Sequence, residues 1–506
     1  MNIAEAKEQV KTTVRAYLEK DELGFFRIRP ANQRPVFLIG APGIGKTAIM
    51  EQIASELGIG LVSYSMTHHT RQSALGLPMI VHRKLSDGTE FDISEYTMSE
   101  IIGSIYDYRE ETGLENGILF LDEINCVSET LYPSMLQFLQ FKTFGRHKVP
   151  DGWIVVCAGN PPEYNRSVHE FDIVTLDRMR KIEVEPDYET WKDYARTTNV
   201  HPAILTYLDV RPEDFYVVES TPEGKSFVSA RGWSDLSVYI KLLEDLGCPV
   251  DKDVVSQFLQ HEEVAERFAA YYDLFDKYKS DYQIESILNG TAPETIAERA
   301  KAAEFDERLA LLGLILDRIC GDMRTVLEQL DMLTDVRDDL RASKAEILDS
   351  ADSASAASAI DECISSHNER AQRANRTGVG LDAARKEQQA INLLKELKES
   401  IGNKKGQEAF NAVESSFEMK GDEMKDASDS TSTMLDNAFE FIERTFGNER
   451  EMLVFVTELT ARWESSQFIG RFGSDSYYAH NQDLMVERTR DELFREIDDI
   501  ASGNRD

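Results

Sequence analysis

The chain has 506 residues, and 91 acidic against 56 basic side chains give it a formal net charge of −35. Such a surface repels phosphate backbones, so broad binding to nucleic acid is disfavoured. Hydrophobic residues make up 42% of the chain, which excludes a wholly disordered protein.

The five cysteines are scattered and form no close pair typical of a zinc site or a redox motif. The charged N-terminus lacks the apolar centre of a signal peptide. No segment approaches the roughly 18 uninterrupted apolar residues that mark a membrane span. We therefore expect a cytoplasmic protein without membrane insertion.

The first part of the chain alternates buried-strand runs with helix patterns. Strand runs occupy residues 36–40, 61–66, 118–122, 153–159 and 181–187, and a helix pattern occupies residues 46–57. Strands separated by helices predict right-handed βαβ units. The expected fold class is therefore α/β, with a parallel sheet covered by helices on both faces.

Two hairpins are expected to decorate this core. Residues 80–85 and 89–93 flank Asp87-Gly88, a strong signal for a tight turn. A weaker pattern places residues 141–144 and 148–149 around Gly145-Arg146.

After about residue 190 the pattern becomes helical. Seven apolar residues between Met323 and Leu340 recur at helical spacing. Residues 349–359 are rich in small residues and fit either a linker or the small face of a helix. Residues 388–401 are amphipathic, whereas residues 421–432 look like an exposed, acidic segment.

A glycine-rich turn follows the first strand run and opens the first helix. Its residues fit the GxxxxGK[ST] phosphate-binding pattern: Gly40, Ala41, Pro42, Gly43, Ile44, Gly45, Lys46 and Thr47. In such loops backbone N–H groups and the helix N-terminus surround phosphate oxygens. Lys46 would contact the β- and γ-phosphates, and Thr47 would bind Mg²⁺ through its hydroxyl.

Polar side chains also end the third and fourth strand runs. Asp122 and Glu123 emerge at the C-terminal end of a buried strand, where parallel sheets place their ligand crevice. We interpret Asp122 as part of the Mg²⁺ shell and Glu123 as the group that orients and polarises the attacking water. Asn160 can hydrogen-bond the γ-phosphate and the same water. A turn-forming Asn before Pro161 and Pro162 is the alternative.

These residues together resemble the AAA+ ATPases, and most closely their MoxR branch. The resemblance rests on the phosphate loop, the Leu-Asp-Glu and Gly-Asn-Pro-Pro strand ends and the stretch LDRMRKIEVEPD, and it spans residues 35–243. It implies an αβα nucleotide domain, a helical lid and a ring, usually a hexamer, with ATP at the subunit interfaces. Both hairpins would then project towards the pore or the substrate face.

The resemblance also assigns two arginines. Arg178 matches the arginine finger, which would reach the γ-phosphate bound by a neighbouring subunit and neutralise charge in the transition state. Arg180 is a competing candidate, and an ordinary ion pair with Asp177 is the structural alternative. Arg231 matches the sensor 2 arginine of the lid, which contacts phosphate within its own subunit. It lies near the start of an expected helix, where the helix dipole disfavours a basic residue.

The sequence therefore predicts a Mg²⁺- and ATP-dependent ring ATPase that remodels, assembles or activates a partner protein. By resemblance, the leading partner class is a protein with a von Willebrand factor A domain. A nucleotide-gated scaffold that binds partners through its helical C-terminal region is the alternative, and a nucleic-acid motor is less favoured because of the charge. We expect an ATP-binding core (1–190), a helical lid with following helices (191–341) and an acidic, mostly helical extension (342–506).

Overall fold

The computed structural model describes residues 1–481 apart from 69–71, 73, 75, 85–87, 165–167, 222, 223 and 378–380. The chain divides into two compact units. The first comprises Met1–Lys192 and Arg211–Glu266, and the second comprises Asp193–Val210 and Arg267–Asp506. The expected three-part division stays a prediction, because units of packing need not follow functional boundaries.

A five-stranded parallel sheet organises the first unit, with the strand order β2-β5-β8-β1-β9. Its strands are β1 (Val36–Gly40), β2 (Gly60–Ser65), β5 (Gly117–Asp122), β8 (Trp153–Gly159) and β9 (Arg180–Val184). All residues of β8 are buried, as expected for a strand with both faces covered. The predicted α/β class with a parallel sheet is confirmed.

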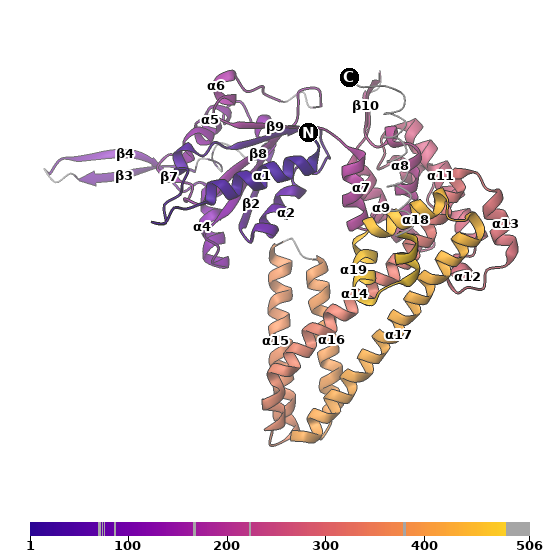
Figure 1. Cartoon of the computed structure of the whole chain (residues 1–506). Helices are drawn as coiled ribbons and strands as arrows, with labels where there is room; N and C mark the ends of the chain where they lie inside the picture. The colour runs from indigo at the N-terminus through magenta and orange to yellow at the C-terminus, as the bar shows by residue number, and fades with distance from the viewer. Residues whose placement is uncertain are drawn as a thin grey trace. The chain divides into compact units, whose positions relative to one another are not determined.

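Two helical layers cover this sheet (Figure 1). One contains α1 (Ile3–Leu18) and α2 (Ala48–Leu57), and the other contains α4 (Glu100–Thr112) and α5 (Tyr132–Phe141). Strand residues alternate between the two cores: Phe120 packs with the first layer, and Leu119 and Leu121 pack with the second. The alternation fixes which strand ends can carry polar groups without disturbing either core.

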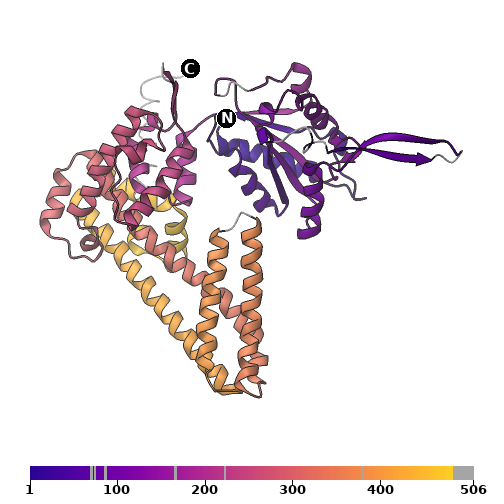
Figure 2. The same ribbon diagram turned by 180° about the vertical axis from the view of Figure 1, so that it is seen from behind.

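Both expected hairpins are present. The longer one pairs β3 (Pro78–Lys84) with β4 (Glu90–Tyr96) and extends away from the sheet as a two-stranded ribbon (Figure 2). Its turn residues 85–87, including Asp87 of the predicted turn, lie outside the described residues. The shorter one pairs β6 (Thr143–Phe144) with β7 (His147–Lys148) around Gly145, whose φ is 56°.

The first unit contains further elements before, between and after the strands of the sheet. They are α6 (Ile173–Leu176), β10 (Val217–Thr221), β11 (Gly224–Val228), α9 (Ala230–Asp245) and α10 (Lys252–Ser256), with short 3₁₀ turns η1 (Pro30–Asn32), η2 (Met66–His68), η3 (Ile124–Cys126) and η4 (Pro212–Asp214). α7 (Tyr188–Thr197) and α11 (Glu262–Asp281) pass from one unit to the other. Trp233 is fully buried, and its indole N–H donates to the Phe215 carbonyl at 3.1 Å, which fixes α9.

The described part of the second unit is helical. Its helices are α8 (Pro202–Val210), α12 (Ile284–Leu288), α13 (Glu294–Ala302), α14 (Phe305–Leu348), α15 (Ser353–Thr377), α16 (Leu381–Ile401), α17 (Gly406–Phe446), α18 (Arg450–Ala461) and α19 (Trp463–Phe472). No helix among the described residues is long and apolar enough to cross a bilayer. The C-terminal extension predicted from residue 342 includes residues 482–506, which lie outside the described residues.

Helices α14 to α17 pack around their own apolar core, with α15 and α16 forming a hairpin (Figure 1). The small-residue stretch 349–359 enters α15 from Ser353 and buries Ala356 and Ala359, so the helix interpretation applies from Ser353 onward. Residues 421–432 form the middle of α17 and bury Ser428 and Thr431, so this segment is not fully exposed.

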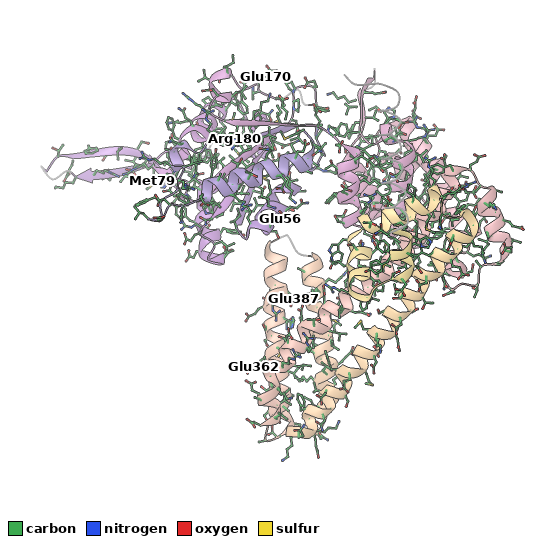
Figure 3. The ribbon with its side chains drawn as sticks, viewed as in Figure 1. Glu56, Met79, Glu170, Arg180, Glu362 and Glu387 are labelled. Carbon is green, nitrogen blue, oxygen red and sulfur yellow. The ribbon has the colours of Figure 1, made fainter. Side chains whose placement is uncertain are left out.

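A buried histidine joins three of these helices. His367 of α15 is fully buried, and its ring nitrogens lie 2.5 Å from a Glu387 oxygen on α16 and 2.7 Å from an Asp339 oxygen on α14. Glu387 is labelled on α16 in Figure 3. The polar link adds a directional contact beside the apolar cluster of these helices.

We expect Leu394→Ala to destabilise this helical core. Leu394 is fully buried, so its truncation removes apolar contacts and leaves a cavity, at a cost of about 2–5 kcal/mol. The measurement is the urea midpoint of the helical transition followed by circular dichroism. Met419→Ala on α17 is the matched control: its side chain is 60% exposed, so its effect should stay within about 0.5 kcal/mol. Equal midpoints for both variants would contradict the assigned core.

Candidate functional site

The phosphate loop lies between the end of β1 and the start of α2. Gly43 and Gly45 have φ angles of 74° and 95°, which favour glycine. A Cβ on Gly40 would lie 2.3 Å from the Val184 carbonyl oxygen, so only glycine fits where the chain leaves the sheet. Thr47 occupies the N-cap position of α2, which directs the first N–H groups of the helix towards the loop.

Lys46 is the buried centre of this loop. Its ammonium donates to the carbonyls of Gly40 (2.8 Å) and Ala41 (2.7 Å). A third bond, 3.0 Å long, reaches the side-chain oxygen of Asn160. Burial is the main cause that lowers the pKa of Lys46 to about 8; the carboxylates of Asp122 and Glu123 oppose this shift, and the positive charge of Arg231 adds to it. The site therefore favours an anion beside Lys46.

Asp122 and Thr47 bring two oxygen ligands together. The Thr47 hydroxyl donates to one Asp122 carboxylate oxygen at 2.9 Å, and the backbone N–H of Glu123 donates to the other at 2.9 Å. Oxygen ligands from one or two side chains, completed by phosphate and water, are what Mg²⁺ prefers. These two residues therefore fit a magnesium ion bound beside a phosphate chain.

Glu123 is held in an unusual conformation by residues that the sequence analysis missed. Its φ is 54°, a region that costs energy for any residue with a side chain. Its carboxylate accepts hydrogen bonds from Ser65 (3.2 Å) and Thr67 (3.0 Å). Ser65 pairs with Asp122 across the β2–β5 ladder. The sequence signal that could have found them is the pair of small hydroxyl residues at and just after the end of β2, the strand that neighbours β5 and its Asp122.

Arg231 and the phosphate loop lie together in the first unit. The backbone N–H of Arg231 donates to the Gly43 carbonyl at 3.1 Å. The Ser229 side chain caps α9 by accepting from the backbone N–H of Gly232. Tyr216 donates its hydroxyl to the Pro42 carbonyl at 3.1 Å. The Arg231 guanidinium makes no hydrogen bond or ion pair with the described residues. The structure thus places the predicted sensor 2 arginine beside its own loop.

Arg178 lies near the N-terminal ends of the parallel strands, opposite the ends that carry the phosphate loop. It occupies the turn between α6 and β9, and Arg180 begins β9 opposite Val36, the first residue of β1. The phosphate loop follows the last residue of β1, so the length of that strand, roughly 15 Å, separates the loop from the start of β9. Figure 3 labels Arg180 on this strand. The structure therefore does not bring Arg178 to the loop of its own chain.

Both candidate finger residues are exposed, and neither guanidinium pairs with a carboxylate among the described residues. An ion pair between Arg178 and Asp177, the structural alternative, is not formed. Asp172 accepts from Thr175, which is the main reason its pKa is low, and the positive charge of Arg178 contributes less.

A comparison with protein families identifies part of the chain. Residues 35–179 match the family model of the AAA domain of the dynein-related subfamily. A search of curated proteins finds no match. The matched segment includes the phosphate loop, the acidic pair, Asn160 and Arg178, whereas Arg180 and Arg231 lie beyond it. The match supports an AAA+ ATPase in general, a class that binds nucleotide, usually with Mg²⁺, and generally forms rings.

We expect nucleotide binding to take up a proton at Lys46. The free amine has a pKa of about 8, and a triphosphate beside it favours the charged form and raises this pKa. The affinity for nucleotide is therefore highest well below pH 8, where Lys46 is already charged, and falls above it. Binding should be about tenfold weaker at pH 9 than at pH 7. Titration with a fluorescent ATP analogue, and calorimetry in two buffers of different ionisation enthalpy, measure this.

The chain offers a matched control for this experiment. Burial also lowers the pKa of Lys142 to about 8, but this lysine caps α5 and lies 3.5 Å from the Gln33 side chain. Lys142→Met should keep the pH dependence, whereas Lys46→Met should abolish binding. A pH dependence that disappears in Lys142→Met would show that the wrong lysine was assigned.

Proposed function

We propose that the chain is a Mg²⁺- and ATP-dependent AAA+ ATPase of MoxR type, with active sites shared between copies in a ring, usually a hexamer. One observation carries the proposal: the predicted phosphate, magnesium and water ligands meet at the C-terminal ends of the strands, whereas Arg178 lies at their opposite ends and pairs with no carboxylate among the described residues. A site that needs Arg178 is completed only by a neighbouring chain.

Each residue of the site has a defined role in this proposal. Water attacks the γ-phosphorus, forming the new P–O bond as the bond to the ADP oxygen breaks. Glu123 polarises the water, Asn160 orients it, and Lys46 stabilises the charge that develops on the phosphate. Arg231 contacts the phosphate from the lid. A magnesium ion held by Thr47 and Asp122 would neutralise phosphate charge when bound.

The rate of hydrolysis per chain should rise with protein concentration and then plateau. A finger supplied by a neighbour makes activity depend on assembly, and loss of such a finger costs about 10³–10⁵-fold in rate. Arg178→Ala should therefore nearly abolish hydrolysis but leave ATP binding intact, whereas Arg180→Ala should have the smaller effect. The measurement is ATPase activity across a wide concentration range, with sizing under the same conditions.

Two outcomes would overturn this part of the proposal. A rate that stays constant down to concentrations where sizing shows monomers would exclude the shared site. A larger loss in Arg180→Ala than in Arg178→Ala would move the finger to Arg180.

The two hairpins support an action on a partner protein. The β3–β4 ribbon exposes Met79, 47% exposed and labelled in Figure 3, and Ile80, 71% exposed. Its charges are largely paired with each other, as in the cross-strand pairs Arg83–Glu95 and Lys84–Glu90, and the His82 ring contacts the Asp92 carboxylate. Arg146 from the β6–β7 hairpin also binds Glu95, so the hairpins are connected. The ribbon therefore offers an apolar rather than a charged contact to a partner.

The identity of that partner is proposed by resemblance alone. Relatives in the MoxR branch act with proteins that carry a von Willebrand factor A domain, and we propose the same class here. Remodelling, assembly or activation of that protein would be the use of the hydrolysis energy. The −35 charge disfavours a nucleic-acid motor.

A nucleotide-gated scaffold is the second candidate, favoured by the separate helical core of α14–α17. Glu123→Gln discriminates between the two. If hydrolysis is the function, this variant should bind ATP normally and hydrolyse it at least about 100-fold more slowly, because the amide cannot polarise water as the carboxylate does. Single-turnover ATPase measurements with parallel binding titrations test this. Undiminished hydrolysis in Glu123→Gln would remove the catalytic role of Glu123. A partner-dependent function that survives in this variant with hydrolysis abolished would favour the scaffold.

A further inference from the structure

The strands that present Glu123 and Asn160 separate before they reach these residues. β5 and β8 pair from Gly117 opposite Trp153 to Leu121 opposite Cys157. Both Glu123 and Asn160 lie past this last pair. The β5–β8 ladder therefore does not set their spacing directly, although β5 still pairs with β2 up to Asp122 and β8 with β1 up to Gly159. In the proposed mechanism both residues must contact one water molecule.

One side chain connects the two segments beyond the ladder. Asn125 lies in η3, two residues after Glu123, and is 2% exposed. Its amide N–H donates to the main-chain carbonyl of Asn160 at 2.8 Å. The carbonyl of Asn125 in turn accepts from the His169 N–H at 2.7 Å. Asn125 is thus fixed through both its backbone and its side chain.

β8 leaves space for the Asn125 amide at Gly159. A Cβ on Gly159 would lie 2.4 Å from the Asn125 side-chain oxygen, so any larger residue would push the two segments apart. That oxygen is buried and has no hydrogen-bond partner among the described residues. A buried acceptor without a partner lowers stability. Stability alone therefore does not explain an asparagine here.

Asn160 is held from two sides as a result. Asn125 binds its main-chain oxygen, and Lys46 binds its side-chain oxygen at 3.0 Å. The first contact sets where the residue lies, and the second sets where its amide points.

We infer that Asn125 is a positioning residue, which fixes Asn160 relative to Glu123 so that both contact the same water. The inference rests on the proposed ATPase function. In this role Asn125 acts through Asn160, whose main-chain carbonyl it binds. A displacement of about 1 Å between such groups is enough to lower a rate by about 100-fold.

Asn125→Asp tests this role with almost no change in shape. The substitution replaces the N–H donor with a carboxylate oxygen facing the Asn160 carbonyl, so the bond becomes a repulsion. We expect kcat to fall at least about tenfold while KM and the affinity for an ATP analogue stay within about threefold, because the phosphate loop is untouched.

Asn116→Asp is the matched control. Asn116 precedes β5 at the opposite end of the same strand pair, and its side-chain oxygen lies 2.4 Å from a Cβ position on Gly152. It therefore repeats the close approach of an asparagine to a glycine away from the phosphate loop. Its kcat and KM should equal those of the wild type. An equal loss of kcat in both variants would show a general structural effect and overturn the inference.

A second measurement does not depend on hydrolysis. With an ATP analogue bound, amide hydrogen exchange over residues 157–164 should be at least about threefold faster in Asn125→Asp than in the wild type, and unchanged in Asn116→Asp. Unchanged exchange in a folded Asn125→Asp protein, or an unchanged kcat, would overturn the positioning role. If the aspartate variant does not fold, Asn125→Ser removes the reach of the amide without adding charge and is measured in the same way.

The outcomes separate this inference from the proposed function. If the wild type binds nucleotide but shows no hydrolysis at any concentration, the ATPase proposal fails, and the exchange measurement still decides whether Asn125 holds Asn160. If the wild type hydrolyses ATP and Asn125→Asp does so equally well, only the positioning role fails.

Discussion

The buried ammonium of Lys46 is the contact on which the phosphate-binding edge depends. It joins the loop carbonyls of Gly40 and Ala41 to the side chain of Asn160, and so links the end of β1 to the end of β8. Burial of a cation is costly unless it is well bonded, and here the cost appears as a pKa lowered to about 8. The same cost makes an incoming phosphate favourable, because the anion restores the charge balance.

The residues around this contact are held by side chains rather than by the sheet. Glu123 has a left-handed backbone, and the hydroxyls of Ser65 and Thr67 hold its carboxylate. Its strain is tolerated because these hydroxyls and the bond from its own N–H to the Asp122 carboxylate restrain it. These contacts keep the Glu123 carboxylate in a defined position, as its proposed catalytic role requires.

The sheet also places the phosphate loop and the Arg178 turn at opposite ends of its strands. Parallel strands place the phosphate loop at their C-terminal ends and the Arg178 turn before the start of β9, so one chain cannot bring both to one nucleotide. A neighbouring copy could, which makes assembly and hydrolysis interdependent in the proposed function. The helical unit has its own core in α14–α17, with the His367 link between three of its helices.

The sequence by itself determined the parallel α/β core, both hairpins and the loop residues, because these depend on local patterns: strand runs, Gly-Lys-Thr spacing and turn residues. It did not reveal Ser65, Thr67 or Asn125 as partners of Glu123 and Asn160, since those contacts join strands that are distant in sequence. It also left residues 349–359 undecided, because small residues suit both a linker and a tightly packed helix. Only the tertiary structure decided these points, by showing which segments lie side by side and therefore which polar groups can bond.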